Sequence, residues 1–248
     1  MGVLGDVVAW LTDAANWSGQ FGIPTRVYEH LQMSVQAIAL GTLIALPVGL
    51  AIGHSRRFEF LAVSTGNIGR ALPSFGIVAI TFALTIDWPG NIGFWPTFIA
   101  LTLLTIPPVL TNSYVGIKGV DEDTVEAARG MGVSGLQSLA RIEIPLAAPL
   151  IVAGLRTAAV QVVATATLGA FTGWGGLGRY IVDGFAVGDD AQIAGGAVLV
   201  ATLAVLTELV LAGLQRVVQP RTVSTGRRTG VTRDRPGAPP ELGPTGAI

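Results

Sequence analysis

The chain has 248 residues, a formal net charge of −1 and no cysteine, and 50% of its residues are hydrophobic. Only 12% are charged, whereas a soluble domain usually carries about 25% charged residues, so the composition indicates a protein of the lipid bilayer. The lack of cysteine excludes disulfides, a thiolate zinc site and a cysteine nucleophile, and the near-neutral charge gives no support for nucleic-acid binding.

The first segment, residues 1–29, is predicted to lie outside the membrane and to contain a short amphipathic helix. Apolar residues recur at roughly helical spacing across 3–17. The segment carries Asp6 and Asp13, and it lacks the basic start and long apolar run of a cleavable signal peptide. A frayed terminus is the alternative.

Five apolar stretches predict five membrane-spanning helices, because a span needs about 20 apolar residues. The second stretch is interrupted by glycines and by Pro73, and the third contains Pro107 and Pro108. Proline removes a helix hydrogen bond, which membranes tolerate where protein or water satisfies the freed carbonyl. Pro73 and Pro107 are therefore candidate pathway or gate residues, with static kinks as the alternative. The predicted spans cover about residues 31–53, 61–86, 94–117, 146–172 and 191–214.

Basic residues predict the orientation, because Lys and Arg are retained on the cytoplasmic side of a membrane. With the N-terminus outside, the inner segments are 54–60, 118–145 and the tail from 215, and they hold eleven of the 15 Lys and Arg residues. The outer segments hold only Arg26 and Arg179. All five tryptophans also fall on predicted outer segments, where an interfacial belt is expected. The sequence therefore predicts an N-out/C-in arrangement.

The last segment, residues 216–248, is predicted to be a disordered cytoplasmic tail. It is rich in Gly, Pro, Thr and Arg and has no apolar face to bury. A solvated tail that sets topology is favoured over one that contacts anionic lipid headgroups. Residues 30–215 are left as one transmembrane domain.

Two charged residues, Arg156 and Glu208, interrupt the fourth and fifth predicted spans. An Arg at the membrane centre costs about 2.5–3.5 kcal/mol on insertion scales, so its side chain must face protein or water. Arg156 is therefore expected either to pair with Glu208 or to line a solute pathway. Both residues remain candidates for the pathway, with a structural pair as the favoured alternative.

Residues 118–145 form a polar and strongly patterned segment between the third and fourth spans. Its acidic residues suit the start of a helix, with Asp121 or Asp123 as the N-cap and Glu126 in the helix. The two alanines that follow favour helix and let another surface approach closely.

Glycine and proline are predicted to divide this segment into two helices. Gly130 and Gly132 are expected to end the first helix, and Pro145 to end a second, amphipathic helix before the fourth span. Two short helices joined by a glycine turn would project from the membrane, and this shape suits the transmission of a rigid push. A plain connector is the alternative.

The segment resembles the EAA loop of permease subunits in bacterial, binding-protein-dependent, ATP-driven importers. In that family the loop docks into a groove on a separate ATPase, and we therefore call residues 118–145 the coupling segment. One position departs from the family pattern, because Ile144 stands where Leu is usual. The matching positions, which the resemblance makes candidate ATPase-coupling residues, are Glu126, Ala127, Ala128, Gly132, Ile142 and Pro145.

Longer stretches resemble the branch of this family that imports quaternary-amine osmoprotectants such as glycine betaine, choline, carnitine and proline betaine. They are 120–132, 145–161 and 166–181, within a similarity that spans about 30–215. Arg70 departs from the pattern, since a neutral residue is expected there. The resemblance implies an all-α integral membrane protein with the type I importer permease fold, five core spans and cytoplasmic coupling helices. It also implies import of a glycine betaine-like solute by alternating access.

The resemblance further implies the partners. A cytoplasmic ABC ATPase would bind ATP and Mg²⁺, an extracytoplasmic solute-binding protein would deliver the solute, and a second permease copy or a paralogue would complete the pathway. This chain would hold no cofactor and no metal, would not be an enzyme and would bind no nucleic acid. It is expected in the cytoplasmic (inner) membrane of a bacterium as a multi-pass protein.

The run 173–178 formally satisfies the dinucleotide pattern G-x-G-x-x-G, but it follows a membrane span and not a strand. Its glycines are predicted to permit a tight turn, and the resemblance implies a short outer helix at 177–185 after that turn. A plain turn is the alternative to a role in docking the binding protein. The candidate docking residues are Gly175, Gly176, Gly178 and Tyr180.

Two other functions are weighed. A permease of the same superfamily that carries methionine or another amino acid is the first alternative. A passive channel or a membrane enzyme is the remote one, because either would need clustered acids, histidines or a selectivity filter, and the spans offer Arg156 and Glu208 as candidates.

Overall fold

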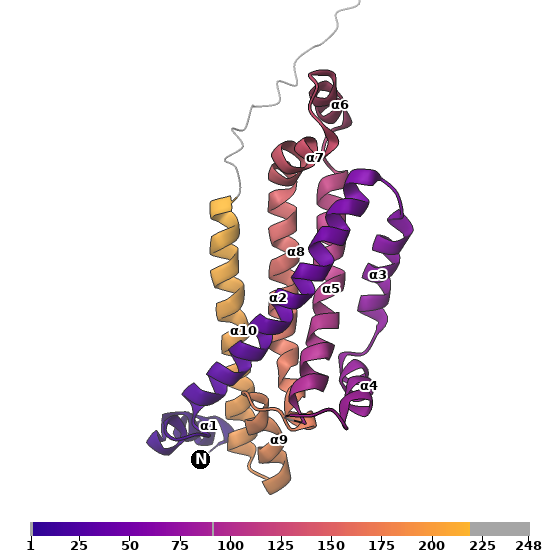
Figure 1. The fold of residues 1–248 in the computed structure, drawn as a ribbon. Coiled ribbons are helices and arrows are strands. Elements are labelled where there is room, and N and C mark those ends of the chain that lie inside the picture. The colour runs from indigo at the N-terminus through magenta and orange to yellow at the C-terminus, as the bar shows by residue number, and fades with distance from the viewer. Residues whose placement is uncertain (1, 91, 219–248) are drawn as a thin grey trace, which may run out of the picture.

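The computed structural model describes residues 2–90 and 92–218, and within these ranges the chain contains helices and loops but no strand. The helices form an elongated bundle with shorter helices at both ends (Figure 1). The long helices are α2 (Ile23–Ser55), α5 (Phe94–Lys118), α8 (Ile144–Thr165) and α10 (Asp190–Val218). The shorter helices are α1 (Val3–Thr12), α3 (Glu59–Ala71), α4 (Ser74–Thr85), α6 (Glu122–Gly130), α7 (Gly135–Ser138) and α9 (Gly178–Val187). Tighter or wider turns lie at Ala14–Trp17, Leu139–Glu143 and Ala166–Thr172.

Four helical runs are long and apolar enough to cross a membrane, and α3 with α4 can count as a fifth crossing. The axes of α3 and α4 are bent by 96° at a short break. The predicted span over 61–86 is therefore broken near Pro73, where the sequence indicates an interruption. The break follows from Pro73, because a residue before proline is pushed into extended backbone, and Leu72 has φ −77° and ψ 126°.

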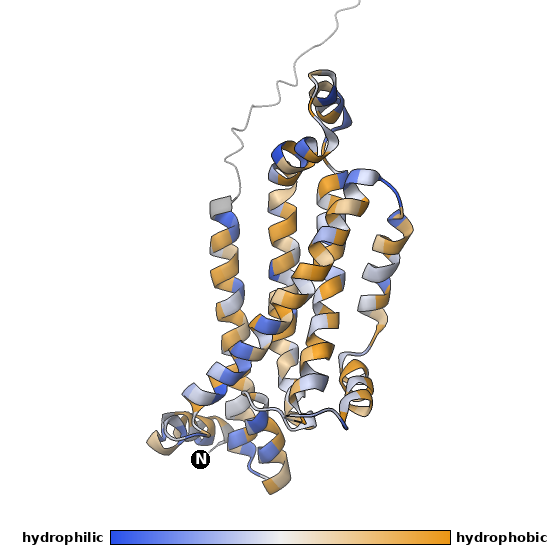
Figure 2. Ribbon diagram, viewed as in Figure 1, coloured by the Kyte–Doolittle hydropathy of each residue, from blue (hydrophilic) through white to orange (hydrophobic). Residues whose placement is uncertain are grey.

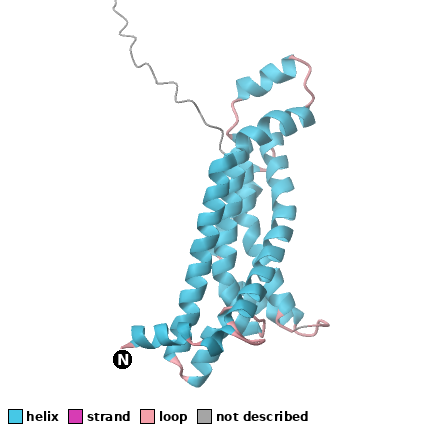
Figure 3. Ribbon diagram, turned by 90° about the vertical axis from the view of Figure 1, so that its left-hand side faces the viewer, coloured by secondary structure: helices cyan, strands magenta, loops and turns pink. Residues whose placement is uncertain are grey.

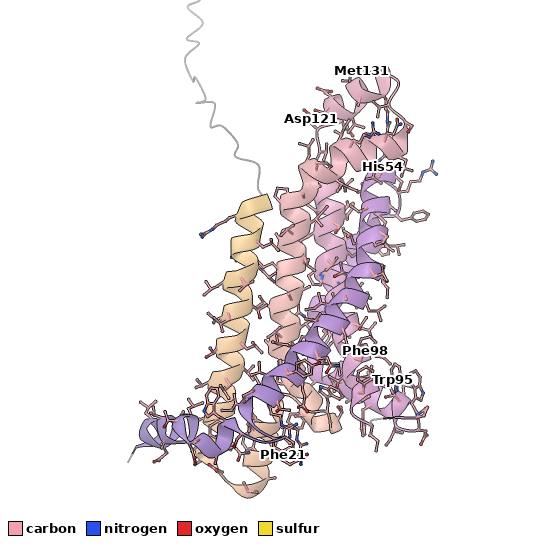
Figure 4. All side chains as sticks on the ribbon, turned by 60° about the vertical axis from the view of Figure 1, so that its left-hand side comes forward. Phe21, His54, Trp95, Phe98, Asp121 and Met131 are labelled. Atoms are coloured by element: carbon pink, nitrogen blue, oxygen red, sulfur yellow. The ribbon has the colours of Figure 1, made fainter. Side chains whose placement is uncertain are left out.

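The basic segments gather at one end of the bundle. Figure 1 shows α6 and α7 beyond that end, with the N-terminus, α1 and α9 at the opposite end. Figure 4 places His54, Asp121 and Met131 together at the first end, and Phe21 and Trp95 at the other. Following the distribution of Lys and Arg, we call these the inner and the outer end. Figure 2 shows hydrophobic residues along the long helices and many hydrophilic residues on α6, α7 and the outer end.

Several helix boundaries differ from those expected. The first long helix begins at Ile23 and not near residue 31, because Pro24 in its first turn already has a helical φ and needs no hydrogen-bond partner for its nitrogen. The last helix continues through Val218, beyond the predicted start of the tail at 216. The rest of the predicted tail, 219–248, lies outside the described residues.

Small residues on one face of α2 let it pack closely on α5. Gly41, Gly49 and Gly53 are all buried in this contact. A Cβ on Gly41 would lie 2.5 Å from the Cβ of Thr105, and one on Gly49 would lie 2.7 Å from the carbonyl oxygen of Leu110. Lipid offers no hydrophobic drive for helix association, so close packing of this kind holds spanning helices together.

The central helix of the bundle is α5, which packs against α2 and α8, while α10 lies at the edge and contacts α8. Buried side chains between these helices include Leu101, Leu104 and Val162. At the outer start of α5, Trp95 meets Trp88 edge-on with ring centroids 5.6 Å apart. Viewed from the side, α6 and α7 stand beyond the ends of the bundled helices (Figure 3).

Candidate coupling segment and solute cavity

The first half of the coupling segment is a short helix, α6, with both ends capped. Asp121 is the N-cap, and its Oδ1 accepts a hydrogen bond from the N–H of Asp123 at 3.0 Å. At the other end Gly132 has φ +86°, a left-handed conformation that glycine adopts without strain. The N–H groups of Gly132 and Val133 then donate to carbonyls of the last turn at 2.9 and 3.1 Å. This is a Schellman cap, and it fixes the direction of the turn that follows α6.

The surface of this half combines acidic and apolar side chains. Glu126 and Ala127 are exposed, whereas Ala128 is 2% exposed. Near the turn that follows α6, Met131 is 79% exposed and Leu136 is 76% exposed. Two large apolar side chains are therefore held in the open on this projecting unit.

The second half of the segment is continuous with the fourth span. A capping box between Ser134 and Gln137 opens α7, which runs through a π-helical turn, Leu139–Glu143, into α8. The prediction that Pro145 ends a helix is wrong. Proline is tolerated in the first turn of α8, where its missing N–H is least needed, and the wider turn before it absorbs the change of pitch. A displacement of this half would therefore pass directly into α8.

The six predicted coupling residues all lie on the projecting unit or at its junction with the bundle. Their role in docking an ATPase stays a prediction. Glu126, Ala127 and Ala128 lie on α6, Gly132 forms its cap, and half-buried Ile142 and exposed Pro145 lie at the junction with α8.

A buried carboxylate joins this junction to the end of α2. Glu143 is 3% exposed, and both of its side-chain oxygens face Nδ1 of His54 at 2.8 and 2.9 Å. The hydroxyl of Ser138 also donates to Glu143 at 2.9 Å. No local pattern in the sequence indicates this contact, because His54 and Glu143 are 89 residues apart.

Two exposed ion pairs lie beside this contact. Arg56 pairs with Glu122 of α6, and Lys118 Nζ lies 2.5 Å from a carboxylate oxygen of Glu59. The pairs are separated by 66 and 59 residues in the chain, so sequence patterns could not reveal them.

A polar cavity of about 410 Å³ opens beside the break between α3 and α4. None of the described side chains that line it is ionisable. Pro107 is part of its wall, where Gly69 lets α3 approach so closely that a Cβ there would lie 2.3 Å from Pro107 Cγ. Pro73 stands between two lining residues at the helix break. The polar lining residues are Ser74, Thr111, Asn112, Thr157 and Gln161.

Arg156 and Glu208 pair with one another and do not line this cavity. The guanidinium meets the carboxylate with two hydrogen bonds, of which Nε to Oε2 measures 2.8 Å, and a third bond of 2.9 Å reaches Gln215 Oε1. The pair joins α8 to α10. The structure therefore favours the structural alternative for these two residues over a place in the pathway.

The glycine run at the outer end closes onto the start of α2. The N–H of Gly176 donates to Glu29 at 2.7 Å, and the N–H of Leu177 donates to Nδ1 of His30 at 3.3 Å. Because Nδ1 accepts, the ring proton is on Nε2, which lies 2.8 Å from the carbonyl oxygen of Val163. His30, which sequence reasoning assigned no role, is 1% exposed and links three parts of the chain.

The residues predicted to dock a binding protein make their contacts inside the chain. A Cβ on Gly178 would lie 2.2 Å from the carbonyl oxygen of Thr167. The hydroxyl of Tyr180 donates to the carbonyl of Phe21 at 2.7 Å, and burial raises the pKa of Tyr180, so the hydroxyl stays protonated. This packing favours the plain turn, and docking stays a prediction. Gly175 is half-buried, and Gly176, Gly178 and Tyr180 are buried.

No cluster in the described ranges, 2–90 and 92–218, groups three or more His, Asp or Glu residues as metal ligands. The chemistry available at these sites is therefore that of hydroxyls, amides, paired charges and exposed helix surface.

Comparison with known proteins assigns the family. A family model described as the binding-protein-dependent transport system inner membrane component matches residues 37–224. The chain belongs to this family and is a multi-pass protein of the inner membrane, as the sequence predicts.

Individual relatives and structures refine the likeness. The chain is similar to the glycine betaine/carnitine/choline transport system permease protein OpuCB of Bacillus subtilis, with 38% identity over 193 residues, 78% of this chain and 87% of the relative. It is 32% identical over 205 residues to the carnitine transport permease protein OpuCB of Listeria monocytogenes, 83% of this chain and 92% of the relative. The solved inward-facing MetNI methionine ABC transporter matches with a TM-score of 0.69 at 21% identity, over 80% of this chain and 96% of that one. The predicted all-α, type I importer permease fold is confirmed.

Proposed function

We propose that this chain is the permease subunit of an ATP-driven importer that carries a quaternary-amine osmoprotectant by alternating access. The observation that carries the mechanism is the coupling segment. Its capped helix α6 projects from the inner end with Glu126 and Ala127 exposed, and its second half is continuous with α8. Such a unit suits a rigid push from outside the membrane into a spanning helix.

The push would come from a separate cytoplasmic ABC ATPase. That partner would bind ATP and Mg²⁺, and this chain would contribute binding surface and motion but no covalent chemistry. The exposed Met131 and Leu136 offer apolar contacts to the partner, and Glu126 offers a charged one. Closure of the ATPase on ATP would displace α6 and switch the bundle between its inward- and outward-open forms.

A second permease copy or a paralogue would cover the polar cavity. The cavity exposes hydroxyl and amide groups from Thr111, Thr157 and Gln161 between helices that cross the bilayer. Polar groups at membrane depth are tolerated where they face protein or a water-filled space, and not where they face lipid. A facing permease would turn this half-open cavity into an enclosed pathway, to which an extracytoplasmic binding protein would deliver the solute at the outer end.

The cargo proposal rests on the relatives whose names state betaine, choline or carnitine transport, at 31–38% identity. A betaine carries a quaternary ammonium and a carboxylate, so it is neutral overall. A lining of hydroxyls and amides, without ionisable groups among the described side chains, would let such a solute pass without holding it tightly.

Methionine or another amino acid is the second candidate cargo. Solved methionine and amino-acid transporters share the fold, but at 18–23% identity this likeness does not identify the transported solute. A passive channel or a membrane enzyme is the remote alternative. A channel would work without ATP, and this separates it from the importer by a simple measurement.

Uptake of radiolabelled glycine betaine tests the proposal. The chain would be expressed with its ATPase and binding protein in cells that lack their own osmoprotectant importers, under salt stress. We expect ATP-dependent uptake that excess unlabelled choline or carnitine reduces and excess methionine does not. Competition by methionine alone would move the cargo to the second candidate, and uptake without ATP would contradict the importer.

A further inference from the structure

The turn between α2 and α3, residues 54–59, is a strained piece of backbone at the inner end. Arg56 and Phe58 both have left-handed conformations, with φ of 52° and 62°. Residues of these types rarely adopt such φ values, and they persist only where surrounding contacts hold them. Since α2 ends at Ser55 and α3 begins at Glu59, these residues make the whole reversal of the chain. We call residues 54–59 the elbow.

Three side-chain contacts join the elbow to residues of the coupling segment, but they are not equivalent. The ion pairs made by Arg56 and Glu59 are exposed, with side-chain accessibilities between 35% and 66%. Exposed ion pairs contribute little to stability. In the third contact the side chain of Glu143 is only 4% exposed where it meets His54. Among these three contacts, only the one made by Glu143 is buried.

Glu143 occupies the π-helical turn that joins α7 to α8, and such turns are frequent at functional sites. Its carboxylate is held from both sides, by His54 of α2 and by Ser138 of α7. Removing the carboxylate would leave buried donors without partners and would detach the elbow from the segment.

We infer that Glu143 is a positioning residue of the transport cycle, an inference that rests on the proposed function. It fastens the base of the coupling segment to the elbow, so that a displacement of α6 moves the elbow as well as α8.

The two routes meet at the polar cavity. The elbow leads into α3, which supplies Gly66 and Gly69 to the cavity wall and ends at the break before α4. The continuous helix leads into α8, which supplies Thr157 and Gln161. Glu143 joins the start of α8 to the elbow that precedes α3. It therefore makes the cavity walls formed by α3 and α8 move together.

Variants of Glu143 test this role in proteoliposomes that contain the complete transporter. The measured quantity is solute taken up per ATP hydrolysed. We expect Glu143→Ala to lower this ratio at least tenfold while hydrolysis stimulated by the binding protein stays within threefold of wild type. Glu143→Gln keeps the size and an acceptor oxygen, and it should keep the ratio within threefold. Asp6→Ala, an exposed carboxylate at the outer end, is the control and should behave as wild type.

A second pair of variants approaches the contact from α2. Asn can place a donor where His54 places Nδ1, whereas Ala cannot. His54→Asn should therefore retain the ratio, and His54→Ala should lower it at least fivefold. A wild-type ratio of uptake to hydrolysis in Glu143→Ala would overturn the inference, because Glu143 would then have no role in coupling. A parallel fall of uptake and hydrolysis would also overturn it, because Glu143 would then only support the fold.

A distance measurement separates this inference from the proposed function. The chain contains no cysteine, so spin labels can be placed at Arg57→Cys in the elbow and Thr124→Cys on α6. We expect a narrow distance distribution in the otherwise wild-type chain and a clearly broader one with Glu143→Ala. An unchanged distribution would overturn the fastening. Absence of any ATP-dependent uptake by the wild type would contradict the proposed function instead.

Discussion

At the scale of single residues, two polar side chains of the bundle, those of Arg156 and His30, find their partners far away in the chain. Arg156 lies in α8 and finds Glu208 and Gln215 on α10. His30 bridges an outer turn and the carbonyl of Val163. In both cases a polar side chain inside an apolar helix joins two elements, because an unpaired donor or charge there would cost more than the contact gains.

The ion pair between Arg156 and Glu208 makes a prediction about stability. Arg156→Leu or Glu208→Leu alone leaves an uncompensated charge between two spanning helices and should lower the free energy of unfolding. The double variant removes both charges and should recover most of that loss. Denaturant unfolding in detergent, analysed as a double-mutant cycle, measures this coupling. Losses that simply add in the double variant would contradict the structural role, and loss of uptake by a stable double variant would restore the pathway alternative.

At the scale of elements, the close contact of α2 with α5 depends on residues without side chains. Gly49 has no room for a Cβ, since the carbonyl oxygen of Leu110 and the Cβ of Ser113 would lie 2.7 and 2.8 Å away. By contrast, nothing lies within 4 Å of a Cβ added to Gly213 in α10. The two glycines are both in apolar spanning helices, so composition alone does not separate them.

These two glycines make a matched pair of variants. Gly49→Val should force α2 away from α5 and lower stability by about 1–3 kcal/mol, as overpacking does. Gly213→Val should change stability by less than about 0.5 kcal/mol, as surface changes usually do. The midpoint of thermal unfolding, followed by tryptophan fluorescence in detergent, compares them. Equal effects of the two changes would contradict the packing described for α2.

The elements also show which features local sequence can predict. The third span was expected at 94–117, and α5 covers Phe94–Lys118, because an uninterrupted apolar run leaves few other solutions. Caps at Asp121 and Gly132 follow from local chemistry. Pro145 misled because proline suits the first turn of a helix as well as a position just after a helix end. The contact between His54 and Glu143 could not be predicted, since only the folded chain brings together residues 89 positions apart.

At the scale of the whole molecule, the parts form one mechanical path. The coupling segment stands beyond the inner end, the polar cavity opens beside the α3–α4 break, and α1 and α9 lie at the outer end (Figure 1). Two helices linked to the segment reach the cavity wall, α8 by direct continuation and α3 through the contact of His54 with Glu143. A protein built in this way can convert a push at one end into a change of access along its length, provided that the push is delivered at α6.

The measurement that tests this most directly is glycine betaine uptake under salt stress by cells that carry Glu126→Arg in place of the wild-type chain. Glu126 is exposed on α6, and reversing its charge should block the partner surface without disturbing the bundle. At equal amounts in the membrane we predict at least a tenfold loss of uptake, while Asp6→Arg at the outer end keeps wild-type uptake. Wild-type uptake with Glu126→Arg would contradict the claim that this surface couples the permease to its energy source.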